Sequence, residues 1–184
     1  IIFRRTRYFC VNSRNMLAHI AEKYGLSQKK ILVVPFSCAK LSKSGVQWTG
    51  QDIFLTYPGR VEPKRKEYDA FLDIAKLFPH ETFCLLGSIK NCLDIKLRAQ
   101  DLGNIITFDD RVSKDEFKNI MLRSKYLFSD FKPEVEVSGI KEIYGRSKDS
   151  GLSYLSYQYN KKIIINDRFI NIFGLEDAVI SFTA

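Results

Sequence analysis

The order of apolar runs and helical patterns limits what this 184-residue chain can fold into more than any other feature of its sequence. From residue 53 onward, short runs are apolar at successive positions, which is typical of strands buried on both faces. Strands are therefore predicted at residues 53–59, 82–88, 104–110, 125–131, 161–167 and 178–184. Helical patterns occupy the intervals between the first five, at residues 69–78, 91–103, 114–124 and 151–160. This alternation predicts an α/β fold with a doubly wound, Rossmann-like parallel sheet.

The first part of the chain has a similar pattern on a smaller scale. A strand is predicted over residues 7–13, a helix over 14–25 and a second strand over 30–36. Residues 40–52 are polar, contain two glycines and have no period, so they are interpreted as a connector. Because the chain begins with two isoleucines, with neither a methionine nor a signal-peptide pattern, we expect it to be a piece of a longer protein.

Composition excludes several classes of protein. The formal net charge of +8 favours anionic partners, but the basic residues are spread along the chain, which weakens a nucleic-acid interpretation. The apolar runs are much shorter than the roughly 20 residues of a membrane-spanning helix. The four cysteines fit neither a CxxC metal pair nor a compact disulfide framework, and indicate thiols in a reducing compartment. We expect a cytoplasmic location, with or without peripheral contact at a membrane surface.

A basic loop follows the strand predicted at 53–59. Sheets of this class bind ligands at the carboxyl ends of their strands, where such loops gather. The loop leaves the strand through a glycine and reaches a helix start, a combination that suits a phosphate group. Its candidate ligand-binding residues are Gly59, Arg60, Lys64, Arg65 and Lys66. A basic turn that only faces water is the alternative.

A second candidate loop spans residues 131–150 and leads into the helix predicted at 151–160. Long loops in compact domains are often functional, and backbone N–H groups at a helix start bind anions. The candidate residues of this loop are Glu142, Tyr144, Gly145, Lys148, Ser150 and Gly151. The alternative is that Ser150 or Asp149 only caps the helix. Since both loops open at one edge of the sheet, a diphosphate with two negative groups is the predicted ligand.

Two further loops have weaker patterns. Gly87 ends a strand and serves either the turn or a ligand. Ser113 and Glu116 form a capping box, but the backbone before them, at Arg111 and Val112, is placed to contact the edge of a planar base. These positions complete the predicted ligand site.

Several stretches resemble the C-terminal, donor-binding domain of the GT-B fold glycosyltransferases, of the group 1-like kind. "YPGRVEPKRKEYDAFLDIAKLFP", residues 57–79, is similar to the strand, "GR" turn and basic helix start of that family. "EIYG", residues 142–145, resembles its Glu-x-Phe/Tyr-Gly element, and "NKKIII" stands where it usually has "GKPVI". Residues 1–46 resemble the end of the acceptor-side domain and the crossover. The resemblance therefore implies a remnant at 1–46 and a donor-binding domain at 47–184.

The resemblance also implies roles for residues in the two loops. It places Arg60, and one of Lys64, Arg65 and Lys66, on the diphosphate of a nucleotide-sugar donor. It makes Glu142 the catalytic carboxylate near the transferred sugar.

The family's second carboxylate has its counterpart at Ser150, where this chain departs from the pattern. The loop resembles a variant in which Lys148 and the Ser150–Gly151 helix start meet the diphosphate. Cations then neutralise the leaving nucleoside diphosphate, and neither a metal nor another cofactor is expected.

The function implied is that of a glycosyltransferase donor domain. It binds a nucleotide-diphosphate sugar for transfer to a glycan or lipid-linked acceptor, with its own N-terminal domain as partner. Without that domain we expect binding but no transfer, and we expect no specific nucleic-acid partner. Because a fold does not fix a function, two alternatives stay open. They are a flavodoxin-like regulatory domain and a basic nucleic-acid binder.

Overall fold

The computed structural model describes residues 6–34, 52–144, 147–148, 150–172 and 179–183. The first range contains strand β1 (Phe9–Val11), helix α1 (Arg14–Tyr24), a short 3-10 helix (Gln28–Lys30) and strand β2 (Ile31–Val33). The Ser13 hydroxyl caps α1 by accepting from the Met16 N–H at 3.4 Å, and Gly25 ends the helix at a φ of 61°. β1 and β2 pair in parallel, as expected for strands joined by a helix. The predicted connector at 40–52 lies outside the described residues, except for Asp52.

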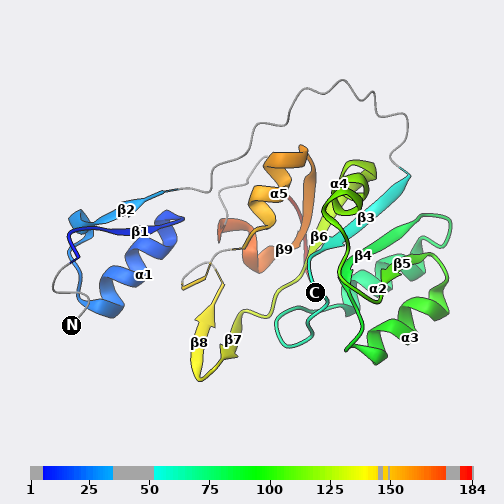
Figure 1. Cartoon of the computed structure of the whole chain (residues 1–184), viewed down its shortest axis with the longest axis horizontal. Coiled ribbons are helices and arrows are strands. Elements are labelled where there is room, and N and C mark those ends of the chain that lie inside the picture. The colour runs from blue at the N-terminus through cyan, green and yellow to red at the C-terminus, as the bar shows by residue number, and fades with distance from the viewer. Residues whose placement is uncertain (1–5, 35–51, 145–146, 149, 173–178, 184) are drawn as a thin grey trace.

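The main domain is built on one six-stranded sheet (Figure 1). Its strands are β3 (Ile53–Pro58), β4 (Phe83–Ser88), β5 (Ile105–Phe108), β6 (Ser124–Ser129), β9 (Lys162–Asn166) and β10 (Val179–Phe182). They lie in the order β10-β9-β6-β3-β4-β5, and every neighbouring pair is parallel. The helices are α2 (Asp69–Leu77), α3 (Leu93–Leu102), α4 (Lys114–Arg123) and α5 (Leu152–Tyr159), and a 3-10 segment (Asp167–Ile172) follows β9. The predicted doubly wound α/β class is confirmed.

Both faces of this sheet are covered, which explains why its strands are apolar at successive positions. In β4, Phe83 and Leu85 belong to the core beneath α2 and α3. Their neighbours Cys84 and Leu86 belong to the core beneath α4 and α5. Burial raises the pKa of the Cys84 thiol to about 12, so this cysteine is a neutral part of the core.

The segment from Phe131 to Ser150, interpreted above as a long loop, contains a β-hairpin. Strands β7 (Glu134–Val137) and β8 (Ile140–Ile143) pair with each other in antiparallel register. The turn between them is Ser138–Gly139, with φ values of 52° and 75°, as a two-residue hairpin turn requires. The alternating "EVEV" followed by Ser-Gly is a recognisable hairpin signal, and the interpretation as a loop was wrong because it gave this signal no weight.

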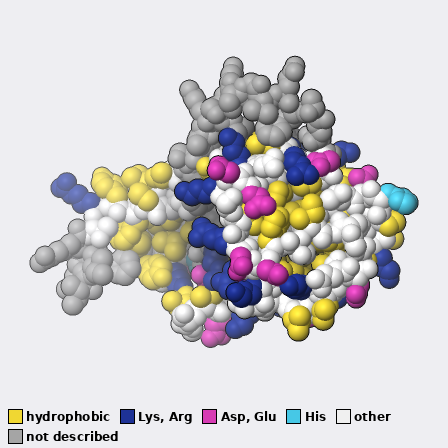
Figure 2. Space-filling view, turned by 45° about the vertical axis from the view of Figure 1, so that its right-hand side comes forward, with side chains coloured by type: hydrophobic (Ala, Val, Ile, Leu, Met, Phe, Trp, Pro, Cys, Tyr) yellow, Lys and Arg dark blue, Asp and Glu magenta, His cyan; other side chains and the backbone are white. Residues whose placement is uncertain are grey.

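Charged side chains of both signs are interspersed on the face of the molecule that Figure 2 shows. Several of the basic residues are paired, among them Arg98 with Asp69 at 2.8 Å and Lys96 with Asp109 at 2.6 Å. Such pairs neutralise individual basic residues on the surface, so a cavity in which several cations gather is the stronger candidate for an anion site.

Candidate functional site

The turn after β3 is held against the end of β4. The Gly59 N–H donates to the Leu86 carbonyl oxygen at 2.9 Å, and Gly59 has a φ of 89° that favours glycine. A Cβ atom on Gly87 would lie 2.6 Å from the Gly59 carbonyl carbon and 2.8 Å from the Arg60 nitrogen, and closer still to the Gly59 oxygen. Gly87 thus allows the two strand ends to approach, and thereby fixes where the Arg60 backbone lies.

Lys66 holds the same turn from the other side. Its half-buried side chain donates from Nζ to the Pro58 carbonyl oxygen at 2.9 Å, and Nζ lies 4.7 Å from the centre of the Tyr57 ring. Desolvation lowers the pKa of Lys66 to about 8, against the opposing attraction of Glu62. Near pH 8, this amine is therefore poised between its neutral and charged forms.

The basic loop and the second candidate loop are joined through backbone and side chains. The Lys132 N–H donates to the Arg65 carbonyl oxygen and the Glu67 N–H to that of Asp130, both at 2.9 Å. These bonds place the basic loop beside the segment that leads into the hairpin. The two candidate loops therefore lie side by side at one edge of the sheet.

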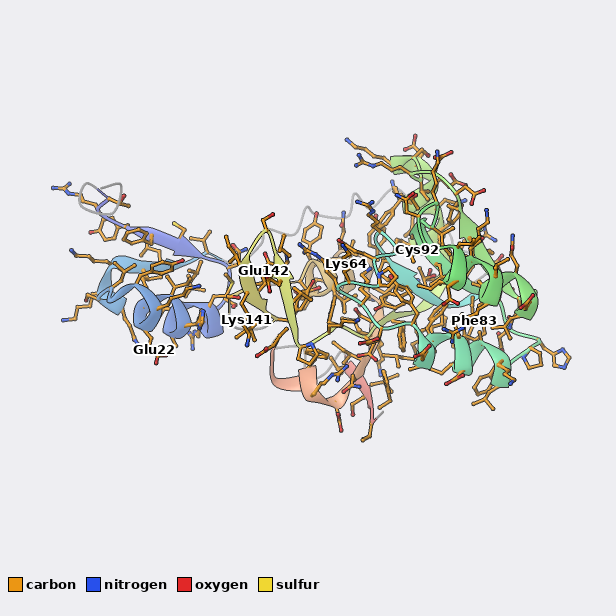
Figure 3. The ribbon with its side chains drawn as sticks, turned by 90° about the horizontal axis from the view of Figure 1, so that it is seen from below. Glu22, Lys64, Phe83, Cys92, Lys141 and Glu142 are labelled. Carbon is orange, nitrogen blue, oxygen red and sulfur yellow. The ribbon has the colours of Figure 1, made fainter. Side chains whose placement is uncertain are left out.

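Glu142, on the hairpin strand β8 (Figure 3), connects the cations of the two loops. Its Oε2 lies 2.6 Å from Nζ of Lys148 and 3.6 Å from a terminal nitrogen of Arg65. Arg65 is also paired with Glu62, at 3.5 Å from Nε to the carboxylate. The Glu142 side chain is 25% exposed, so the solvent screens these pairs only in part.

The residues before α5 have mixed roles. Tyr144 is buried and stacks on Phe131, with ring centres 4.6 Å apart, and Nζ of Lys148 lies 6.0 Å from the Tyr144 ring. Ser150 is buried, and its hydroxyl accepts from the Leu152 N–H at 3.2 Å, which is a helix-start contact. Gly151 is the N-cap residue of α5. Gly145, also predicted here, lies outside the described residues.

Most of the predicted site residues line two adjoining cavities. The first encloses about 320 Å³ and is lined, among the predicted residues, by Gly59, Arg60, Arg65, Lys66, Tyr144, Lys148, Ser150 and Gly151. The second encloses about 710 Å³ and is lined, among them, by Gly59, Arg60, Gly87, Arg111 and Val112. Gly59 and Arg60, together with Phe117, line both. The cavities therefore meet at the turn after β3.

Two predicted residues are placed differently. Lys64 is exposed and lines neither cavity. Glu142 does not line the smaller cavity itself, but contacts two of the cations that do. Of the three basic residues that the sequence left as alternatives, Arg65 and Lys66 thus face the cavity.

No protein-family model matches the chain, and no curated protein matches it. Several solved structures, in contrast, are similar to it in fold. A glycosyltransferase from Rickettsia africae ESF-5 is 15% identical with a TM-score of 0.58, covering 97% of this chain and 50% of that one. AviGT4, a glycosyltransferase involved in avilamycin A biosynthesis, is 11% identical with a TM-score of 0.64, covering 94% and 49%. The lipopolysaccharide outer core galactosyltransferase WaaB is 12% identical with a TM-score of 0.54, covering 96% and 48%.

The fold is that of GT-B glycosyltransferases. The resemblance found in the sequence is thus confirmed at the level of the fold, with the six-stranded domain as a Rossmann-like half of the GT-B architecture. The chain spans about half the length of these three proteins. The boundary predicted at 46/47 lies outside the described residues.

The two cavities also have an apolar wall that sequence reasoning did not assign to the site. Phe117 of α4 lines both cavities, and Leu152, Leu155 and Tyr159 of α5 each line one of them. The three α5 residues are spaced three and four apart, so they share one helix face. That spacing is visible in the sequence, but it is equally typical of a helix that packs only against a core.

Two features are absent from the residues that the structure describes. The described residues contain no group of three or more His, Cys, Asp or Glu side chains placed to hold a metal ion. No helix among them is both long enough and apolar enough to cross a membrane.

Proposed function

We propose that this chain is the donor-binding part of a glycosyltransferase that takes a nucleotide-diphosphate sugar. One observation carries the proposal. Four cationic side chains from two loops distant in sequence line one cavity, and a larger cavity adjoins it at Arg60. The phosphate groups of a diphosphate need such a cluster of cations, and a nucleoside needs a larger cavity beside it. The fold of the glycosyltransferases described above supports the same assignment.

In this proposal the smaller cavity receives the diphosphate and the larger one receives the nucleoside. Arg60, Arg65 and Lys148 supply charge-assisted hydrogen bonds, and Lys66 supplies a further charge below its pKa of about 8. The backbone near Arg111 and Val112, with the apolar wall beside it, receives the base.

The chemistry that such a site supports is transfer of the sugar with the nucleoside diphosphate as leaving group. As the bond from the sugar to the phosphate breaks, negative charge develops on the leaving oxygen, and fixed cations stabilise it. Glu142 stays the predicted carboxylate near the sugar. The proposal includes a glycan or lipid-linked acceptor that is held by a separate N-terminal domain. It also includes a cytoplasmic location, with or without contact at a membrane surface. It requires no metal ion.

Titration with UDP-, GDP- and ADP-sugars tests the proposal on the chain as it is. We expect at least one of them to bind, with NMR shifts on residues of the two loops, and no transfer to an acceptor. The absence of any calorimetric or NMR response to all three would overturn the proposal. Stronger and steeply salt-dependent binding of long nucleic acids would favour the nucleic-acid alternative instead.

Donor affinity should depend on pH through Lys66. Only the protonated amine attracts phosphate, so above its pKa of about 8 binding must first take up a proton. As Lys66 loses its proton, we expect the affinity to fall about tenfold between pH 7 and pH 9. The diphosphate of the donor does not titrate in this range, so it adds no pH dependence of its own. Calorimetry in buffers of different ionisation enthalpy measures the proton uptake directly. A Lys66→Met variant should bind more weakly at pH 7 and show no such uptake.

A further inference from the structure

We propose that Glu142 is a specificity-determining residue that sets the charge of the cavity to match the donor rather than the released nucleoside diphosphate. This inference rests on the proposed function, and it concerns how the same site distinguishes its ligands by their charge. It gives the carboxylate a role that does not require contact with the sugar.

The charges around the smaller cavity suggest the match. Among the described residues that line it, four are cationic, Arg60, Arg65, Lys66 and Lys148, and one, Glu62, is anionic. The carboxylate of Glu142 is bound to two of those cations. With both carboxylates ionised and Lys66 protonated, the described lining of the smaller cavity together with Glu142 carries a net charge of about +2 at pH 7.

The two ligands of a sugar transferase differ by one charge at the same place. The diphosphate of a nucleotide sugar is a diester with two negative charges. After transfer, the terminal phosphate of the nucleoside diphosphate is free and, since its second pKa is about 6, it carries a further charge at pH 7. A diphosphate cavity of net charge about +2 is neutralised by the donor but left with excess negative charge by the product.

The position of Glu142 is fixed, so its charge acts on every ligand. Its backbone pairs with Val135 across the hairpin, and its carboxylate bonds Lys148 at 2.6 Å. To leave the site it would have to break its pairs with both Lys148 and Arg65. Because the side chain is only a quarter exposed, water screens its repulsion of a third ligand charge incompletely.

A Glu142→Gln variant tests the inference with three ligands that share a base and differ in charge. These are the nucleotide sugar, the nucleoside diphosphate and the nucleoside triphosphate, titrated at pH 7.0 and low salt. Removal of the negative charge should tighten all three, by roughly threefold, fivefold and tenfold in that order. Glu142→Asp keeps the charge and should keep the wild-type ratios.

The matched control is Glu134→Gln, the same change on the same hairpin. Glu134 is paired with Lys141 at the surface, where the two side chains are 53% and 62% exposed. We expect this variant to leave all three affinities within about twofold of the wild type. A thermal melt of each variant checks that the fold is retained.

Other results would overturn the inference. If Glu142 acts through the sugar, Glu142→Gln weakens the nucleotide sugar and leaves the two sugar-free nucleotides unchanged. Equal shifts for all three ligands, or weaker binding of all three, would also contradict charge matching. If the wild type binds none of them, the proposed function itself fails, and this outcome is distinct from the others.

Discussion

Replacement of Gly87 by alanine will lower the free energy of unfolding by about 3 kcal/mol and displace the turn that carries Arg60. The added Cβ would lie within 2.8 Å of three backbone atoms of Gly59 and Arg60. Backbone cannot rotate aside as a side chain would. The turn is also held at both ends, by the Gly59 N–H on Leu86 at 2.9 Å and the Val61 N–H on Ser88 at 3.3 Å. Urea unfolding followed by circular dichroism measures the loss.

Gly151→Ala is the control for this prediction. No heavy atom lies within 4 Å of a Cβ at that position, and its φ of −66° suits any residue. Its stability should stay within about 1 kcal/mol of the wild type. A Gly87→Ala protein as stable as Gly151→Ala would contradict the close approach of the strand ends.

The double variant Arg60→Ala/Lys148→Ala should weaken binding of the nucleotide sugar about a hundredfold or more. The two side chains come from different loops, and each substitution removes a charge-assisted contact of about 1.5 to 3 kcal/mol. Calorimetry or NMR titration of the wild type, both single variants and the double variant measures the two contributions and their coupling.

Lys64→Ala provides the comparison, because it removes the same charge from the same loop. Lys64 is exposed and lines neither cavity, so we expect a loss of affinity below about threefold. Should Lys64→Ala cost as much as either single variant, long-range charge and not the cavity would account for the binding.

The sheet was predictable from the sequence because its cause is local. Runs such as "FCLLGS" are apolar on both faces of a strand, and helices cover both faces here. The choice of the two candidate loops followed from a general rule on the carboxyl ends of parallel strands. These inferences needed no knowledge of which side chains meet.

The choice among Lys64, Arg65 and Lys66 could not be made in this way, because the loop that carries them has no helical or strand period. The Lys66 side chain turns inward, where its ammonium group meets the Pro58 carbonyl oxygen and the Tyr57 ring. The link from Glu142 to Arg65 joins positions far apart in the chain, and depends on the hairpin register that sets where β8 ends. Such contacts are products of the folded state.

The hairpin that carries Glu142 has a consequence for how the sequence of this domain can diverge. Among the described residues its strands pair only with each other, outside the six-stranded sheet, and the Phe131–Tyr144 stack closes its base. Apart from Val135 and Val137, its residues make no part of the core. We therefore expect this segment to tolerate exchange as a unit, while the scaffold that folds the domain stays unchanged.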